Sequence, residues 1–225
     1  SNLVIREGGI RGIVICLRHE GFTQIEVREN ILHCGAGVRL KHIANAARDA
    51  GLAGLEFLEG IPGCLGGALR MNAGAWGGET FEQVESVRFM TRDGQIEERT
   101  GFEMGAVYRS CPVLRDHIAL SAVLRGELES LKQVRARMDA LRKQRTESQP
   151  HNRSAGCMFK NPDTSSAGKL VDECGLKGLR IGGAMISERH GNFIINDGTA
   201  TANDVLKLIE QVREHVKTER GIDLH

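Results

Sequence analysis

The residues with the clearest chemical potential lie in one glycine-rich stretch, residues 59–79. Its sequence, EGIPGCLGGALRMNAGAWGGE, holds seven glycines and the only tryptophan of the chain, with acidic residues only at its two ends. Because glycine has no Cβ, a ligand can approach its main-chain N–H group closely, and successive N–H groups form a concavity that binds anions. The stretch therefore predicts a phosphate against the backbone and a planar group beside NAGA. Tight turns in a β-rich domain are the alternative.

Common motifs for other cofactors are absent from the sequence. No glycine of residues 59–79 is followed by Lys-Ser or Lys-Thr, as a P-loop requires. No GxGxxG joins an expected strand to an expected helix, so a Rossmann fingerprint is missing. The His, Asp and Glu residues show no metal-ligand spacing such as HExxH, and we predict no metal site.

Composition excludes several classes of partner. The chain of 225 residues has 30 basic and 29 acidic residues, a net charge of +1, which provides no basic field for nucleic acid or membranes. Aromatic residues make up only 4%, so base-stacking surfaces are not expected. No apolar run approaches the ~20 residues of a membrane span. Six dispersed cysteines without a CxxC pair favour reduced thiols in a cytoplasmic protein. Apart from Cys157, most are expected to be small buried side chains: Cys16, Cys34, Cys64, Cys111 and Cys174.

The elements that must position these residues fall into two regions of a mixed α+β chain. Alternating and apolar runs bounded by turn residues predict strands at 12–17, 23–29, 31–37, 117–128 and 192–197, and a hairpin at 83–101 around Asp93-Gly94. Helical periodicity predicts helices at 39–51, 129–147, 167–176 and 201–221, the last between an N-cap Thr201 and Gly221. The change of texture near residue 149 is the expected domain boundary. The abrupt ends, SNLVIREGG and ERGIDLH, lead us to expect a chain truncated at both ends.

Four stretches in this order resemble the UDP-N-acetylenolpyruvoylglucosamine reductase (MurB) family, in the version without longer insertions. They are residues 51–79 with the glycines, GAVYRSC at 105–111, SAGCMFKNP at 154–162 and GLKGLRIGGAMISERHGNFIIN at 175–196. The resemblance implies a partial vanillyl-alcohol-oxidase-like FAD-binding domain at 1–128, a connecting helix at 129–148 and a smaller α/β substrate-binding domain at 149–225. The family's assisting glutamate and most of its first pyrophosphate loop would fall outside this chain.

The activity that the resemblance implies is a reduction in peptidoglycan precursor synthesis in the cytoplasm. NADPH reduces FAD, and the enolpyruvyl ether of UDP-N-acetylglucosamine then receives a hydride and a proton to give UDP-N-acetylmuramate. No nucleic acid, membrane or obligatory protein partner is implied. By resemblance, the cofactor contacts are Ser1, Asn2, Gly63, Gly67, Asn72, Ala73 and Gly74.

The resemblance also assigns the remaining site residues. Arg109 would stabilise the developing enolate, since a guanidinium is always charged and binds a carboxylate in two-pronged fashion. Cys157 would donate the proton, because a thiol with an ordinary pKa of about 8.5 is mostly protonated at neutral pH. Tyr108 is expected to pack. The substrate-binding candidates are Asn161, Lys169, Arg180 and His190.

Two other functions stay open from the sequence. A module that binds a UDP-sugar without redox activity would be colourless when purified. A flavin oxidase of the same wider fold would consume its substrate without NADPH, but Cys64 is the only residue of the glycine-rich stretch that could attach a flavin covalently.

Overall fold

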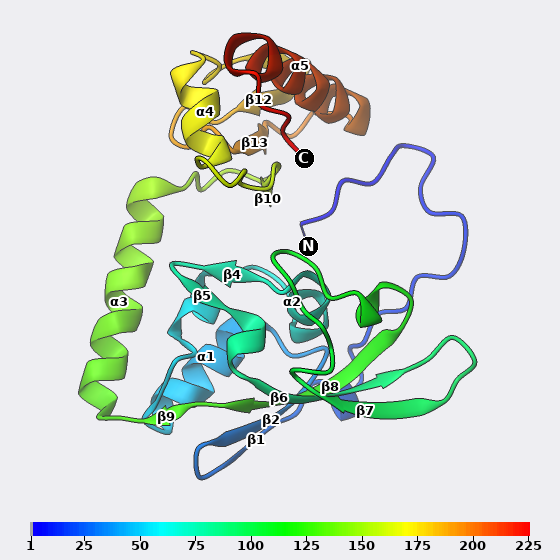
Figure 1. Ribbon diagram of the computed structural model, residues 1–225, viewed down its shortest axis with the longest axis vertical. Helices are drawn as coiled ribbons and strands as arrows, with labels where there is room; N and C mark the ends of the chain where they lie inside the picture. Colours follow the sequence, from blue (N-terminus) through cyan, green and yellow to red (C-terminus); the bar gives the residue numbers. More distant parts are fainter. Residues whose placement is uncertain (1) are drawn as a thin grey trace. The chain divides into compact units, whose positions relative to one another are not determined.

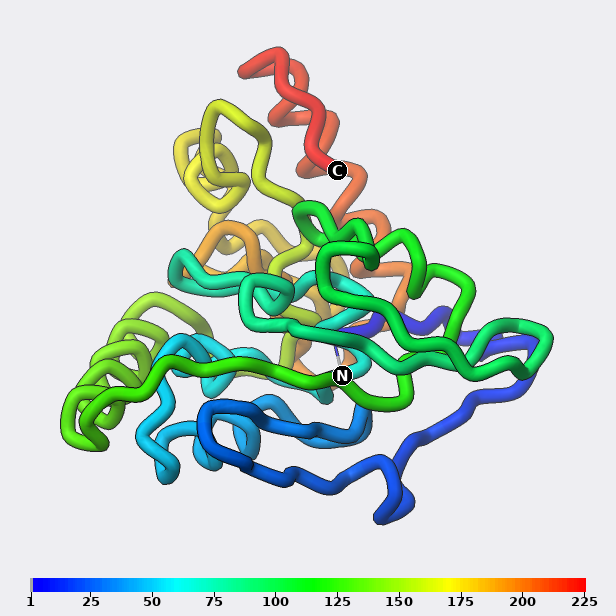
Figure 2. Tube along the Cα trace, turned by 60° about the horizontal axis from the view of Figure 1, so that its bottom comes forward, coloured from blue at the N-terminus to red at the C-terminus, as the bar shows by residue number. Residues whose placement is uncertain are grey.

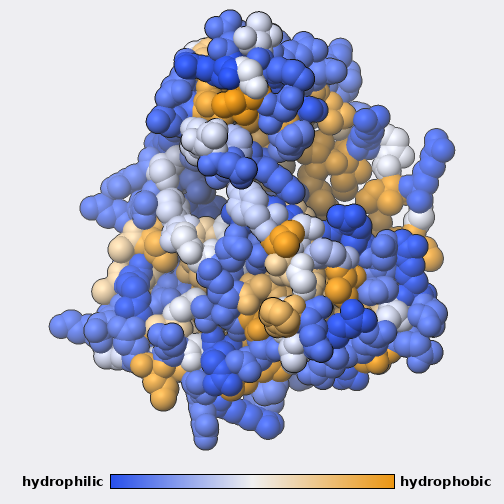
Figure 3. All heavy atoms as spheres, in the orientation of Figure 1, coloured by the Kyte–Doolittle hydropathy of each residue, from blue (hydrophilic) through white to orange (hydrophobic). Residues whose placement is uncertain are grey.

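The computed structural model describes residues 2–225, which divide into two compact units (Figure 1). The larger unit comprises residues 15–144, and the smaller unit comprises residues 145–225 together with the N-terminal residues up to Val14. Hydrophilic side chains cover most of the face seen in Figure 3, in keeping with the even balance of charges. None of the helices within residues 2–225 is both long and apolar enough to cross a membrane.

The larger unit is built on an antiparallel five-stranded sheet. Its strand order is β1-β2-β8-β6-β7, with β1 at Ile25–Arg28, β2 at Ile31–Gly35, β6 at Val84–Met90, β7 at Ile96–Thr100 and β8 at Ile118–Arg125. The predicted hairpin is confirmed: β6 and β7 pair around Asp93-Gly94, where Gly94 has a φ of +85°.

Helices α1 (Leu40–Asp49) and α2 (Leu65–Met71) cover one face of this sheet (Figure 1). Helix α3 (Leu131–Ser148) follows the last strand of this unit in the sequence. Short elements complete the unit: strands β3 (Leu52–Ala53), β4 (Gly74–Ala75), β5 (Gly78–Glu79) and β9 (Glu127–Leu128), and 3-10 turns η1 (Glu20–Phe22), η2 (Glu56–Gly60), η3 (Thr80–Glu82) and η4 (Val113–Arg115). The core between helices and sheet is centred on Leu32, Leu40, Leu65, Phe89 and Leu124, each at most 1% exposed.

The smaller unit has an antiparallel sheet and two helices. The strand order is β10-β13-β12-β11, with β10 at Ser154–Cys157, β11 at Arg180–Ile181, β12 at Ala184–Ile186 and β13 at Phe193–Asn196. Helices α4 (Ala167–Glu173) and α5 (Ala202–Arg220) share a core with Ala184, Ile186 and Ile194. As predicted, Thr201 caps α5, in a capping box with Asp204, and Gly221 ends it with a φ of +67°.

The strand predicted at residues 12–17 is wrong. Residues 2–17 form no strand, and Ile13, Val14 and Ile15 are 91%, 69% and 62% exposed. Figure 2 traces this N-terminal segment in blue. A strand needs a neighbour to pair its N–H and C=O groups, and none of the strands in the described residues pairs with this segment.

Candidate active site

The glycine-rich stretch contains a helix that the sequence analysis did not predict. Helix α2 runs from Leu65 to Met71, and its buried residues Leu65, Ala68 and Leu69 follow helical spacing. The main-chain N–H groups of Leu65 and Gly66 donate to the carbonyls of Val38 and Ala36, each at 2.8 Å. These bonds fix the start of α2 on the loop after β2, because they satisfy two donors that a helix N-terminus leaves unpaired.

The glycines of α2 differ in what surrounds them. A Cβ on Gly66 would lie 3.3 Å from Ala36, whereas a Cβ on the exposed Gly67 would meet no protein atom within 4 Å. Gly63, before the helix, has a φ of +126°, a backbone that side-chain-bearing residues rarely adopt. The backbone at Gly67 is therefore open to a ligand, and this surface fits the FAD that the sequence predicts.

A tight hairpin follows the helix and carries strained backbone. Strands β4 and β5 pair Gly74 with Glu79, and Trp76-Gly77 form the turn with φ values of +58° and +88°. A Cβ on Gly74 would lie 2.6 Å from the carbonyl oxygen of Gly78, so the pairing requires glycine there. Of the five non-glycine residues with positive φ in residues 2–225, three belong to this region: Asn72, Trp76 and Arg109. Such strain is concentrated at functional sites in proteins.

Asn72 ties the end of α2 to its surroundings. It is 3% exposed and has a φ of +39°. Its amide nitrogen donates to Glu79 Oε2 at 2.8 Å and to the carbonyl of Val107 at 3.3 Å, and its amide oxygen accepts from the N–H of Phe81 at 3.1 Å. The next residue, Ala73, uses its carbonyl to accept from Thr80, whose hydroxyl lies 2.7 Å away. The side chain of Asn72 therefore makes its hydrogen bonds within the protein.

Arg109 is held against the same hairpin. Val107 and Ser110 exchange two main-chain hydrogen bonds, so Tyr108 and Arg109 form the tip of a tight turn. The guanidinium donates through Nη2 to the carbonyl of Gly74 at 3.0 Å and through Nη1 to the carbonyl of Asn72 at 3.3 Å. Its Cζ lies 4.6 Å from the ring centroid of Tyr108. Arg109 is thereby brought together with Asn72, Ala73 and Gly74, while Gly63 and Gly67 lie at the other end of α2.

In the smaller unit, Cys157 lies at the end of an irregular strand. Residue Cys157 pairs with Phe193 across a shift in register between β10 and β13, where Gly156 has a φ of +85°. The Cys157 side chain is exposed. The Asn2 side chain lies beside this bulge, since a Cβ on Gly156 would be 3.0 Å from Asn2 Nδ2. Ser1, the other predicted N-terminal cofactor contact, lies outside the described residues.

Three of the four predicted substrate residues gather around the start of α4. The side-chain oxygen of Asn161 accepts from the N–H of Ala167 at 3.0 Å, and Lys169 lies in the first turn of the helix. His190 Cε1 would lie only 2.9 Å from a Cβ on Gly168. Arg180 is apart from them: it lies on β11, at the opposite sheet edge from β10, with its Nη1 2.7 Å from Asp197 Oδ2.

His190 and Asn192 link these segments. Burial lowers the pKa of His190, which packs edge-on against Phe193 with ring centroids 4.9 Å apart. Asn192, which the sequence reasoning missed, is 3% exposed; its side chain accepts from the N–H of Phe159 at 2.8 Å and donates to the Phe159 carbonyl at 2.9 Å. Its fixed contacts set the path of the SAGCMFKNP segment. The sequence offered only an asparagine directly before an apolar run, which does not show that the side chain is buried.

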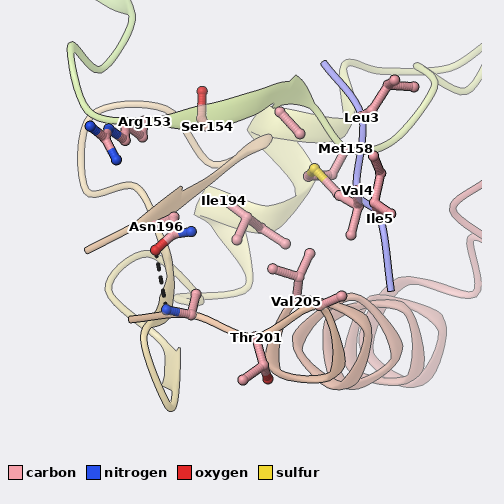
Figure 4. A pocket seen from close by; sticks show the side chains of 13 residues that line it. Leu3, Val4, Ile5, Arg153, Ser154, Met158, Ile194, Asn196, Thr201 and Val205 are labelled. Carbon is pink, nitrogen blue, oxygen red and sulfur yellow. Dashed lines mark hydrogen bonds between the residues drawn. The ribbon is translucent and has the colours of Figure 1, made fainter. Parts of the chain in front are cut away.

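Two hollows in the smaller unit lie beside this region. One, of about 280 Å³, lies between the N-terminal residues 3–5, β10, β13 and the start of α5 (Figure 4). Its lining includes Met158, Ile194 and Val205, and beside it Asn196 accepts from the N–H of Ala200 at 3.2 Å. The other, of about 330 Å³, is lined by residues 150–152, 185, 187–189 and 195. Neither lining includes a predicted site residue.

Two known domain families match this chain. Residues 1–100 match an FAD binding domain, and residues 149–225 match the C-terminal domain of UDP-N-acetylenolpyruvoylglucosamine reductase. With the mixed helix and sheet architecture, this defines a flavoprotein and confirms the predicted fold class. The chain belongs to the UDP-N-acetylenolpyruvoylglucosamine reductase (MurB) family, as its four motifs predicted.

The similarity extends over the whole chain. The protein is 43% identical over 225 residues to the UDP-N-acetylenolpyruvoylglucosamine reductase of Nitrobacter winogradskyi, covering 100% of this chain and 74% of that protein. It is 45% identical over 226 residues to that of Paramagnetospirillum magneticum, covering 73% of the relative. The crystal structure of the Thermus caldophilus enzyme matches with a TM-score of 0.86 and 40% identity, over 99% of this chain and 80% of that one.

Proposed function

We propose that this protein uses NADPH and FAD to reduce the enolpyruvyl group of UDP-N-acetylglucosamine enolpyruvate, giving UDP-N-acetylmuramate for peptidoglycan synthesis. The observation that carries this function is the identity of 43% to a named reductase over the entire chain. A module that binds the UDP-sugar without flavin is not favoured, because residues 1–100 match an FAD binding domain.

The FAD site is proposed at the backbone of residues 63–74. When bound, FAD supplies hydride transfer between NADPH and the substrate alkene. Gly63 and Gly67 would let the main chain meet the cofactor without a Cβ in between, and the open space over Gly67 supports this. Asn72, Ala73 and Gly74 would offer the hairpin backbone, which the buried Asn72 side chain holds in shape. Asn2 remains a proposed contact.

Arg109 is proposed to bind the substrate carboxylate and to stabilise the enolate as negative charge develops on it. The guanidinium is permanently charged and is held by two carbonyls and the Tyr108 ring, so little reorganisation is needed when the charge forms. The positive φ of Arg109 supports a functional role, since a turn at this position would be more stable with glycine.

Cys157 is proposed to deliver the proton to the alkene carbon that does not receive the hydride. A thiol donates a proton to a carbanion, and the exposed position at the end of β10 leaves the sulfur accessible. The register shift at Gly156 supports this role, because a bulge redirects the side chain that follows it.

Residues 149–225 are proposed to bind the UDP-sugar, with residues 1–128 as the FAD domain and 129–148 as the connecting helix. Asn161, Lys169 and His190 would contact the nucleotide-sugar, and their gathering at the start of α4 supports a shared role. Arg180 is retained as a fourth contact. We also propose a cytoplasmic location and small-molecule partners only, with no nucleic acid, membrane or obligatory protein partner.

The test begins with the purified protein mixed with FAD and desalted. The proposal predicts retained flavin bands, NADPH oxidation that depends on the enolpyruvyl substrate, and a product heavier by two hydrogen atoms. A colourless protein that binds UDP-N-acetylglucosamine would overturn the proposal in favour of a binding module. Substrate consumption without NADPH would point to an oxidase.

A further inference from the structure

Glu79 is the last residue of the glycine-rich stretch, and neither the sequence prediction nor the proposed mechanism gives it a role. It ends β5 and caps the 3-10 turn η3. Its Oε2 accepts from Asn72 Nδ2 at 2.8 Å, and its side chain also accepts from the N–H of Glu82 in a capping box. With two fixed donors, the carboxylate has little freedom to move. Its second oxygen, Oε1, lies 3.4 Å from Arg109 Nη1.

This oxygen completes a rim of acceptors around the guanidinium. The carbonyls of Asn72 and Gly74 accept from Nη1 and Nη2, and Glu79 adds a negative charge on the Nη1 side. The Tyr108 ring covers one face of the guanidinium. An arginine has five N–H donors, and these contacts within residues 2–225 use at most three. At least two donors are therefore left for a ligand carboxylate.

The turn that carries Arg109 explains why its side chain needs several anchoring contacts. Tyr108 and Arg109 occupy the two central positions of a turn, and only Arg109 has a positive φ, of +55°. This is the pattern of a type II turn, whose second central position favours glycine or asparagine. A long side chain at a strained turn tip is mobile unless it is anchored. The Glu79 and Arg109 side chains are 32% and 29% exposed, so solvent screens their attraction only in part.

We propose that Glu79 is a positioning residue: it holds the Arg109 guanidinium in the orientation that binds the substrate carboxylate. The inference rests on the proposed function. Removing the charge would leave Arg109 attached through two neutral carbonyls and the Tyr108 ring, and these would hold the guanidinium less firmly in its orientation. The cost would fall on the step in which Arg109 meets developing charge. FAD binding would be kept, because a neutral side chain that still accepts from Asn72 Nδ2 preserves the hairpin backbone proposed to contact FAD.

The test is Glu79→Gln, which keeps the size of the side chain and removes its charge, with Glu79→Ala as a second variant. Glu85→Gln is the matched control, because Glu85 also pairs with an arginine of the same unit, Arg125, and neither residue is assigned to the site. Rapid mixing separates flavin reduction by NADPH from flavin reoxidation by the enolpyruvyl substrate. We expect Glu79→Gln to slow reoxidation on the order of 10- to 100-fold, with flavin reduction and FAD retention within about twofold of the control.

A double-mutant cycle distinguishes positioning from a general structural effect. In an Arg109→Ala background, Glu79→Gln should change reoxidation by less than about twofold, since there is no guanidinium to hold. An equal loss in both backgrounds, or no loss in either, would overturn the inference. If the parent protein is reduced by NADPH but not reoxidised by the substrate, the proposed function fails instead. A crystal structure of Glu79→Gln then decides: a guanidinium that keeps both carbonyl contacts refutes positioning, and a displaced one supports it.

Discussion

Replacing Gly67 with alanine should separate cofactor binding from folding. Gly67 is the third residue of α2, it is exposed, and an added Cβ would meet no protein atom within 4 Å. Its backbone lacks a positive φ, so alanine fits without strain. The new methyl group would instead occupy the space where FAD is proposed to approach the main chain. The fold should therefore tolerate a change that the cofactor does not.

Gly67→Ala should raise the stability of the cofactor-free protein and lower its affinity for FAD. In a helix, alanine is favoured over glycine by about 0.8–1.0 kcal/mol, which for a chain of this size raises the melting temperature of the cofactor-free protein by roughly 2–4 °C. Forcing a methyl group into a packed contact costs about 1–3 kcal/mol. At 1.4 kcal/mol for each tenfold change in affinity, FAD should bind roughly 5- to 150-fold more weakly.

The neighbouring glycine provides the matched control. A Cβ on Gly66 would lie 3.3 Å from both the Cβ and the carbonyl oxygen of Ala36, so Gly66→Ala crowds the protein interior and not the ligand side. We expect Gly66→Ala to lose the helix-propensity gain through this crowding while its FAD affinity stays within about threefold of the parent. The assay is titration of each cofactor-free variant with FAD by flavin fluorescence, alongside thermal unfolding without FAD.

One result would refute the reasoning. If Gly67→Ala binds FAD as tightly as the parent while the protein is equally or more stable, the main chain at Gly67 does not touch the cofactor. A loss of stability in Gly67→Ala would instead contradict the open environment of this glycine.

Three further predictions concern other residues. Cys157→Ala should lower the rate of substrate reduction by about 10²- to 10⁴-fold, the usual contribution of a general acid, and leave flavin reduction by NADPH unchanged; an equal loss in both half-reactions would argue against a proton donor. Asn72→Ala should lower the free energy of unfolding by about 3 kcal/mol for two reasons. The partners of the Asn72 side chain lose their hydrogen bonds, and alanine tolerates the left-handed backbone less well than asparagine. Asn72→Gly should recover roughly 1 kcal/mol of this in denaturant unfolding, and equal losses would contradict the strain. Burial lowers the pKa of His190 below its usual 6.5, so the unfolded state binds that proton more readily, and the stability of the fold should decrease as the pH drops below about 6.5. The melting temperature of His190→Gln should therefore fall less than that of the parent between about pH 7.5 and pH 5.5. An identical fall would show that His190 does not contribute to the pH dependence.

Much of the fold follows from local sequence signals. The Asp93-Gly94 hairpin and the capped helix α5 carry turn and cap residues whose backbone preferences are strong, and both are present as predicted. Helix α2 was not predicted, because its two glycines have low helix propensity and hide the spacing of three buried residues. The strand predicted at residues 12–17 failed because an apolar run of β-branched residues shows a preference for a strand but not a pairing partner.

The site shows the same division. The glycines and Arg109 were identified from sequence, since they belong to motifs. Glu79 ends the same glycine-rich stretch but was given no role, because its link to Arg109 spans 30 residues and depends on the β4–β5 hairpin and the turn at residues 107–110. Asn192 was missed for a similar reason: its value lies in main-chain partners 33 residues away. Contacts of this range are set by tertiary packing, which no local pattern encodes.

The most direct test of the central claim is a single turnover without oxygen. The FAD-loaded protein is bleached with one equivalent of NADPH and then mixed with UDP-N-acetylglucosamine enolpyruvate. The account predicts that the visible flavin band returns as UDP-N-acetylmuramate forms in equal amount, and that UDP-N-acetylglucosamine in place of the substrate leaves the flavin reduced. A flavin that stays bleached with the enolpyruvyl substrate, in a protein that binds both FAD and the nucleotide-sugar, would contradict the account.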